Sequence, residues 1–110
     1  MQLDVVSDTV CPWCYIGKRR LDAALEQRSS AGITLRWRPF QLDASIPDGG
    51  VDRKAYMQKK FGADPDRAKA AGSAIRDYGD QLGIKFNFDK IKLAPNTLDS
   101  HRLIRWAGTA

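Results

Sequence analysis

The chain has 110 residues, enough for one domain with a single core or for part of a larger domain. Its hydrophobic content of 43% and charged content of 28% are ordinary for a water-soluble globular protein. No apolar stretch approaches the roughly 18 residues that cross a bilayer, which argues against a membrane partner. The net charge is +5, but the basic residues are dispersed and form no stripe with aromatic residues. This pattern argues against a nucleic-acid partner.

The start of the chain, MQLDVVSD, lacks the basic beginning and the long apolar stretch of a signal peptide. We therefore expect the chain to be cytoplasmic. Thiols rest in the reduced state in that compartment. A close pair of cysteines there is more often catalytic or metal-binding than a permanent cross-link.

The first forty residues predict a strand, a helix and a second strand. The run QLDVVSD at 2–8 is short and apolar enough to lie inside a sheet. A helix is expected from Pro12 to about Arg28, because proline is tolerated in the first turn. The RSSAG stretch ends this helix, with Gly32 in the turn. The alternation in ITLRWRPF at 33–40 predicts a half-buried strand, so the two strands should be parallel with a right-handed crossover.

The sequence changes character after Gly50, following a loop rich in turn-forming residues. Helices are expected within 51–62 and 64–83, the second of them capped by Asp64. We therefore predict two parts, a βαβ unit over 1–45 and a helical part over 46–110.

A last helix is expected after Pro95, capped by Asn96 or Thr97. The apolar face predicted for it comprises Leu103, Trp106, Ala107 and Ala110. We expect both Trp106 and the earlier Trp37 to be core residues.

The two cysteines of the chain, Cys11 and Cys14, lie three residues apart where the first strand meets the first helix. Unpaired N–H groups and the positive end of the helix dipole favour a thiolate at a helix N-terminus, where Cys11 is expected. Cys14 is expected one turn further into the helix, within reach of Cys11. We therefore expect Cys11 to attack disulfides and Cys14 to resolve the mixed disulfide. Pro12 and Trp13 tune the reduction potential without bringing a charge.

Two other interpretations of the cysteines are weaker. Structural zinc needs about four ligands, whereas this chain offers two cysteines and a distant histidine, His101, so no metal site is predicted. Two inert, buried cysteines are common in proteins generally. A CxxC pair between a strand and a helix in a βαβ unit instead favours redox chemistry.

Four residues are candidates for substrate contact: Pro12, Trp13, Tyr15 and His101. Trp13 and Tyr15 flank the dithiol where a bound peptide would pass, although they could equally pack in a core. His101 on the last helix is either an ordinary half-buried histidine or a polar group near the dithiol.

Three segments carry a family resemblance: VVSDTVCPWCYIGKRRLDAAL at 5–25, WRPFQLD at 37–43 and PNTLDSHRLIRWAG at 95–108. They resemble the DsbA-like thioredoxin family in its FrnE-type branch, which is related to the 2-hydroxychromene-2-carboxylate isomerases and the kappa-class glutathione transferases. The resemblance implies an α/β, thioredoxin-like fold with an all-helical insertion after the first βαβ unit. It also implies thiol–disulfide oxidoreductase or disulfide isomerase activity on protein or small-molecule disulfides, with Cys11 as nucleophile and Cys14 resolving.

The glutathione-dependent relatives supply the alternative function. In that branch the position matching Cys11 resembles a serine that handles the sulfur of glutathione, so the cysteine pair favours the disulfide branch. That branch shares Asn96, Thr97 and His101 with this chain, so a glutathione-dependent isomerase or transferase remains the alternative. In that alternative, the resemblance implies that His101 is a polar group near a glutathione carboxylate. Glutathione is thus expected as a redox partner or co-substrate, with no bound cofactor. A third alternative is an inactive binding module whose thiols do not react.

The family's fold continues with a strand preceded by a cis-proline, a hairpin strand and a closing helix. The prolines of this chain do not occupy such a place: they are Pro12, Pro39, Pro47, Pro65 and Pro95. We therefore expect a chain truncated before the remaining sheet strands, corresponding to the N-terminal half of the family. An exposed sheet edge then predicts self-association or a partner that completes the sheet.

Overall fold

The computed structural model describes residues 1–28, 32–62 and 64–109, which form two compact units. The first unit comprises Met1–Ala44 and the residues from Thr97 onward, and the second comprises Ser45–Asn96. This division differs from the predicted 1–45 and 46–110, because the last helix belongs to the first unit. The hydrogen bonds that tie it there join residues far apart in the chain, which sequence periodicity does not reveal.

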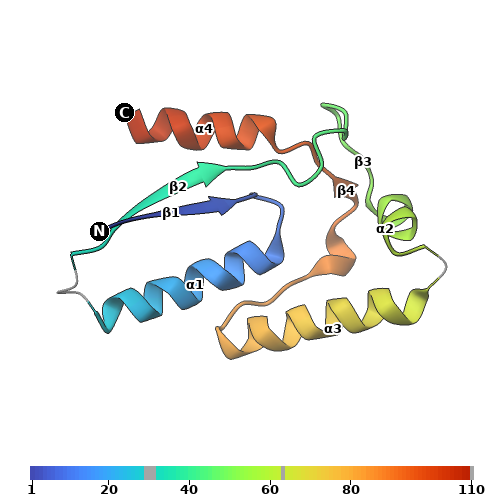
Figure 1. Ribbon diagram of the computed structural model, residues 1–110. Coiled ribbons are helices and arrows are strands. Elements are labelled where there is room, and N and C mark those ends of the chain that lie inside the picture. Colours follow the sequence, from blue (N-terminus) through green and yellow to red (C-terminus); the bar gives the residue numbers. More distant parts are fainter. Residues whose placement is uncertain (29–31, 63, 110) are drawn as a thin grey trace. The chain divides into compact units, whose positions relative to one another are not determined.

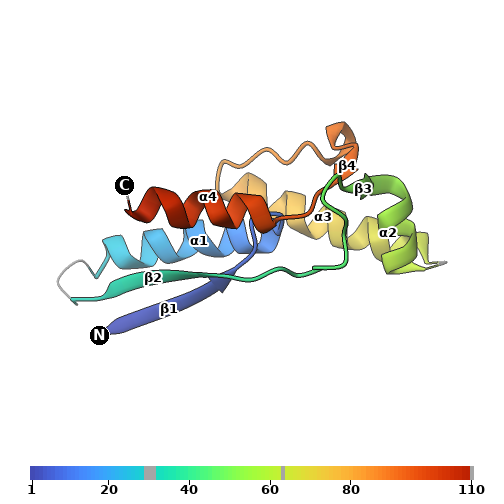
Figure 2. The same ribbon diagram turned by 90° about the horizontal axis from the view of Figure 1, so that it is seen from above.

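The first unit contains the predicted βαβ crossover. Its elements are β1 (Gln2–Ser7), α1 (Pro12–Glu26), β2 (Thr34–Pro39) and α4 (Leu98–Thr109). The strands β1 and β2 pair in parallel, as predicted, and lie side by side in Figures 1 and 2. Asp4 and Arg36 face each other in this register and form two hydrogen bonds of 3.0 and 2.9 Å. In Figure 1, α1 lies on one side of the strand pair and α4 on the other.

Helix α1 begins where the sequence predicts. Cys11 is its N-cap residue and Pro12 stands in the first turn, where a missing N–H costs no intrahelical bond. Ile16 faces inward and is 1% exposed, which makes it the apolar anchor of this helix. The predicted terminator includes Ser29, Ser30 and Ala31, which lie outside the described residues. Gly32 has a φ of 65°, the left-handed conformation that suits glycine in a turn.

Two tryptophans predicted to lie in the core do not. Trp37 on β2 is 39% exposed and Trp106 on α4 is 66% exposed, so that prediction was wrong. Helical spacing identifies an apolar face but not whether another element covers it. Within the described ranges, no element covers the side of α4 that carries Trp106 and the likewise exposed Leu103. Ala110, assigned to the same face, lies outside the described residues.

The second unit is largely helical, as predicted. Its elements are β3 (Val51–Asp52), α2 (Arg53–Phe61), α3 (Pro65–Gln81), the 3-10 turn η2 (Phe88–Lys90) and β4 (Leu93–Ala94). Asp52 caps α2, and Asp64 caps α3 as expected, each through its carboxylate and a backbone N–H. The short antiparallel pair of β3 and β4 was not predicted, because two residues are too few to show an alternating pattern. None of the described helices is long and apolar enough to cross a membrane.

Two glycines of α3 differ in the space around them, and this difference gives a test of the second unit. A Cβ on Gly79 would lie 2.7 Å from the ring of Phe86, whereas one on Gly72 would meet only the end of Arg76 at 3.6 Å. Gly79→Ala is expected to lower the free energy of unfolding by about 1–3 kcal/mol through overpacking. Gly72→Ala is the matched control and should raise it by about 0.5–1 kcal/mol through helix propensity. Denaturant unfolding of both variants measures this, and equal effects would contradict the close packing at Gly79.

Candidate active site around the two cysteines

The structure brings Cys11 and Cys14 together at the start of α1. Both are half-buried thiols with no disulfide between them. Cys11 ends the loop that follows β1, and its backbone carbonyl accepts hydrogen bonds from the N–H groups of Cys14 and Tyr15. This turn places Cys14 next to Cys11, and the two thiols share a hydrogen bond. The pair can therefore form a disulfide or share one proton.

Hydrogen bonds decide which sulfur ionises more readily. Burial raises the pKa of the Cys11 thiol, and the interaction with Cys14 adds to this rise. Burial also opposes ionisation of Cys14, but the N–H of Asp8, the Cys11 thiol and the Ser7 hydroxyl together lower the pKa of Cys14. The resting negative charge of the pair is thus favoured on Cys14. This is the reverse of the order predicted from the position of Cys11 at the helix end.

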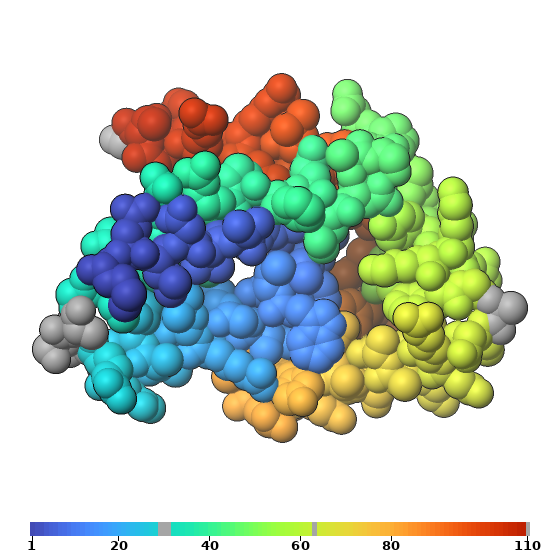
Figure 3. Space-filling model, viewed as in Figure 1, coloured from blue at the N-terminus to red at the C-terminus, as the bar shows by residue number. Residues whose placement is uncertain are grey.

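Both thiols border a cleft of about 280 Å³. Figure 3 shows an opening between β1, in dark blue, and α1, in lighter blue. The residues that line the cleft are Ser7, Asp8, Thr9, Cys11, Cys14, Tyr15, Lys18 and Trp37. Lys18 is the cationic member, but its ammonium lies 2.6 Å from the carboxylate of Asp22 one turn further along α1. Its charge is therefore already paired.

The aromatic candidates lie on the surface near the dithiol. Trp13 is 45% exposed and Tyr15 is 48% exposed, and Tyr15 also lines the cleft. Pro12 is half-buried in the first turn of α1 and does not line the cleft. The structure thus leaves both aromatic rings accessible from outside. Their contact with substrate stays a prediction.

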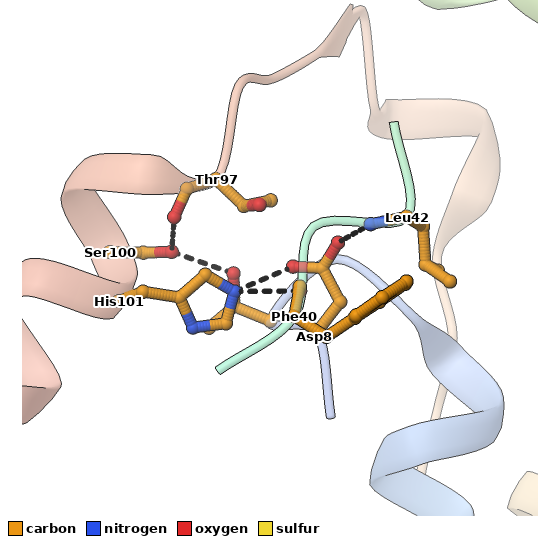
Figure 4. Close-up of polar contacts among 7 residues, drawn as sticks. Asp8, Phe40, Leu42, Thr97, Ser100 and His101 are labelled. Atoms are coloured by element: carbon orange, nitrogen blue, oxygen red, sulfur yellow. Dashed lines mark hydrogen bonds and ion pairs between the residues drawn. The ribbon is translucent and has the colours of Figure 1, made fainter. Parts of the chain in front are cut away.

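Asp8 is a site residue that the sequence analysis missed. Its side chain is 1% exposed, and it lies at the carboxyl end of β1, three residues before Cys11. One carboxylate oxygen accepts the N–H of Leu42 at 2.8 Å, and the other lies 3.0 Å from Nε2 of His101 (Figure 4). The Thr97 hydroxyl donates to the same carboxylate, as does the N–H of Thr9. Burial opposes ionisation, but these donors outweigh it and lower the pKa of Asp8.

His101 is oriented toward Asp8. Nε2 lies 3.0 Å from Asp8 Oδ1 and 3.0 Å from the carbonyl oxygen of Phe40. Both partners are acceptors, so Nε2 must carry the hydrogen and donate to them. The ring is 10% exposed. The structure thus gives His101 a buried carboxylate as partner, and its predicted contact with substrate or glutathione stays a prediction.

A second hydrogen-bond chain fastens the start of α4. Ser100 donates its hydroxyl to the carbonyl of Thr97 at 2.6 Å (Figure 4). It therefore accepts from the hydroxyl of Thr9 at 2.7 Å. The loop that follows β1 is thereby joined to the first turn of α4. The only sequence signal for this arrangement is the run of polar residues between the first strand and the CxxC pair.

Across the described ranges, no three His, Cys, Asp or Glu side chains gather as a metal site would require.

Comparison with known proteins relates this geometry to a family. The family model described as "DSBA-like thioredoxin domain" matches residues 2–110. A probable DsbA oxidoreductase from Streptomyces coelicolor has a similar solved structure, with a TM-score of 0.85 and 26% identity, covering 99% of this chain and 47% of the other. The uncharacterized protein YwbO of Bacillus subtilis (strain 168) is 27% identical over 97 residues, 88% of this chain. The chain spans 42% of the length of that protein.

Proposed function

The chain belongs to the DSBA-like thioredoxin domain family, and from this membership we propose that it is a thiol–disulfide oxidoreductase whose reacting groups are Cys11 and Cys14. The observation that carries the proposal is the contact between the two thiols at the start of α1, beside an open cleft. Two thiols that already share a hydrogen bond need little backbone movement to form a disulfide.

The proposed reaction moves two electrons. A thiolate of the pair attacks a sulfur of the substrate disulfide, so one S–S bond breaks, a mixed disulfide forms and a substrate thiolate leaves. The second cysteine then loses its proton and attacks the first, which releases the other substrate thiolate. The substrate disulfide is thereby reduced to a dithiol, and Cys11 and Cys14 are oxidised to a disulfide. The reverse sequence oxidises a substrate dithiol.

Cys11 is the proposed nucleophile and Cys14 the resolving thiol. The N–H groups of Trp13 and Cys14 point to the Cys11 sulfur and stabilise its thiolate once the proton has left. The hydrogen bond between the thiols offers that proton a direct route to Cys14. The raised pKa of Cys11 lowers its thiolate fraction at neutral pH by more than it raises the nucleophilicity of that thiolate. The assignment of Cys11 as nucleophile therefore rests on its position as the N-cap residue of α1.

The proposed substrates are protein or small-molecule disulfides, with glutathione as a redox partner. The exposed rings of Trp13 and Tyr15 offer apolar contacts beside the dithiol for a peptide side chain. We also propose membership of the FrnE-type branch and a cytoplasmic location, both on the sequence features described above.

A glutathione redox titration tests the function. The chain is equilibrated in mixtures of reduced and oxidised glutathione, and its free thiols are alkylated and counted by mass. We expect one two-electron transition that joins Cys11 to Cys14, between about −120 and −270 mV as in known dithiol enzymes. A stable mixed disulfide between Cys11 and glutathione would favour the isomerase or transferase alternative. Thiols that do not respond would overturn the redox proposal.

A further inference from the structure

Trp37 lines the cleft that holds both thiols, although the sequence predicted it to be a core residue. It lies on β2, is 39% exposed and borders the cleft together with Cys11 and Cys14. In the parallel register Trp37 is the partner of Val5, and side chains alternate along a strand. Trp37 and Ser7 therefore lie on the same face of the strand pair. Because Ser7 also lines the cleft, this face is the one turned toward the thiols.

The packing of α1 against the strands does not depend on Trp37 alone. Ile16 is 1% exposed and is the apolar anchor of the helix, and Leu35, two residues before Trp37 on the same face, is half-buried. Trp37 itself stays accessible in the cleft. Free energy is gained when an apolar group displaces water from the apolar surface of an indole ring. Trp37 is therefore placed to bind an apolar group beside the dithiol.

The polar side chains of the cleft already have partners within the chain. The carboxylate of Asp8 accepts several hydrogen bonds, and the ammonium of Lys18 is paired with a carboxylate one turn further along α1. The hydroxyl of Thr9 is bonded to the first turn of α4. None of these three groups is left to select a charged or polar substrate group. The aromatic side chains of Trp37 and Tyr15, which line the same cleft, are what it offers to a substrate.

We propose that Trp37 is a specificity-determining residue, which contacts an apolar side chain next to the substrate cysteine. The proposal rests on the dithiol function above and names its substrate class: disulfides in which a cysteine has an apolar or aromatic neighbour. The cleft volume of about 280 Å³ lies at the lower end of the range for small-molecule sites. Such a volume suits one side chain and not a long peptide.

Two alkylating reagents that differ only in a benzyl group test this contact. Iodoacetamide and N-benzyl-iodoacetamide both convert a thiolate to a thioether and release iodide. The rate of the first addition to the reduced chain at pH 7 is followed by mass spectrometry. The benzyl rate divided by the iodoacetamide rate is the apolar preference, and a glycine-flanked cysteine peptide gives its reference value. We expect the chain to exceed the reference about threefold to tenfold, and a preference equal to the reference would overturn the proposal.

Substitutions of tryptophan assign the preference to one ring. Trp37→Ala should reduce it nearly to the reference value, whereas Trp37→Phe should keep most of it because an aromatic ring remains. Trp106→Ala is the matched control, since Trp106 is also an exposed tryptophan of the first unit but does not line the cleft. It should leave the preference unchanged. An undiminished preference in folded Trp37→Ala, or an equal loss in Trp106→Ala, would overturn the proposal.

Fluorescence keeps the proposal testable if Trp37→Ala does not fold, which circular dichroism detects. The chain has three tryptophans, so Trp13→Phe with Trp106→Phe leaves only Trp37, and Trp13→Phe with Trp37→Phe leaves only Trp106. Both chains are alkylated with the nitrobenzyl form of the reagent, whose ring quenches tryptophan emission on contact. We expect strong quenching of Trp37 and little of Trp106. Equal quenching of the two would overturn the proposal.

Alkylation needs no disulfide substrate, so the two proposals can fail separately. A preference that depends on Trp37 in a chain without a redox transition would contradict the proposed function and leave the contact at Trp37 standing. A redox transition in a chain without this preference would support the proposed function and overturn the role of Trp37.

Discussion

Replacing Cys11 by serine is expected to abolish all two-electron exchange between this chain and a disulfide substrate. The reaction needs two sulfurs, and the chain contains no cysteine other than Cys11 and Cys14. A serine hydroxyl is not ionised at neutral pH and cannot form the mixed disulfide. Loss of activity should therefore be complete, and not only a change in rate. Stopped-flow measurement of the reduction of a single-disulfide peptide checks this.

Cys14→Ser is the informative partner of this variant. It keeps the proposed nucleophile and removes the resolving thiol, so a covalent mixed disulfide between Cys11 and the substrate should accumulate and be visible by mass spectrometry. If Cys14→Ser instead stayed inert while Cys11→Ser formed the mixed disulfide, Cys14 would be the nucleophile. Because the pKa of Cys14 is lowered, Cys14 competes with Cys11 as the attacking thiolate, and the two variants decide between them.

The same pair of variants separates the redox proposal from the glutathione alternative. A glutathione-dependent isomerase or transferase that uses a hydroxyl at this position would retain activity in Cys11→Ser. Retained glutathione-dependent turnover in that variant would therefore contradict the dithiol mechanism. Thiols that neither oxidise nor alkylate at neutral pH in the parent chain would instead favour the inactive binding module.

Local sequence patterns predict most of the first unit. Strand β1, helix α1 and strand β2 each follow from a short run of residues, and their order dictates the parallel crossover. The proline in the first turn of α1 fixes where the helix begins, and this in turn places Cys11 at its N-cap. The juxtaposition of the two thiols is therefore encoded within a few residues.

The surroundings of the thiols could not be predicted in this way. The donors to Asp8 come from Leu42, Thr97 and His101, which are far from Asp8 in the chain and carry no shared pattern. The same long-range contacts bring α4 into the first unit, against the predicted division. The order of the two cysteine pKa values depends on the Ser7 hydroxyl and the Asp8 N–H, which both act on Cys14. The prediction from the sequence took into account only the helix N-terminus near Cys11.

Asp8→Ala is expected to destabilise the first unit more than any other single substitution outside its apolar core. The variant removes the common acceptor of the Leu42 N–H, the His101 ring and the Thr97 hydroxyl. Removing one partner from a buried ionic network costs about 3–5 kcal/mol, a large part of the stability of a small domain. Thermal unfolding followed by circular dichroism should show a fall in Tm of about 10 °C or more. A fall of only one or two degrees would contradict the buried network.

The pH dependence of stability tests the ionised state of the same carboxylate. Because the pKa of Asp8 is lowered on folding, its contribution is present above the unfolded carboxyl pKa of about 3.9 and is lost as pH falls through the lower folded pKa. The Tm of the parent chain should therefore decline on acidification below about pH 4, and part of this decline should be absent in Asp8→Asn. Asp4→Asn is the control at pH 7, because Asp4 is exposed and its pair with Arg36 is accessible to water. The Tm of the Asp4→Asn variant at pH 7 should therefore be nearly the same as that of the parent chain. If the acid decline were equal in the parent and in Asp8→Asn, the carboxylate would not be the group that these donors hold ionised.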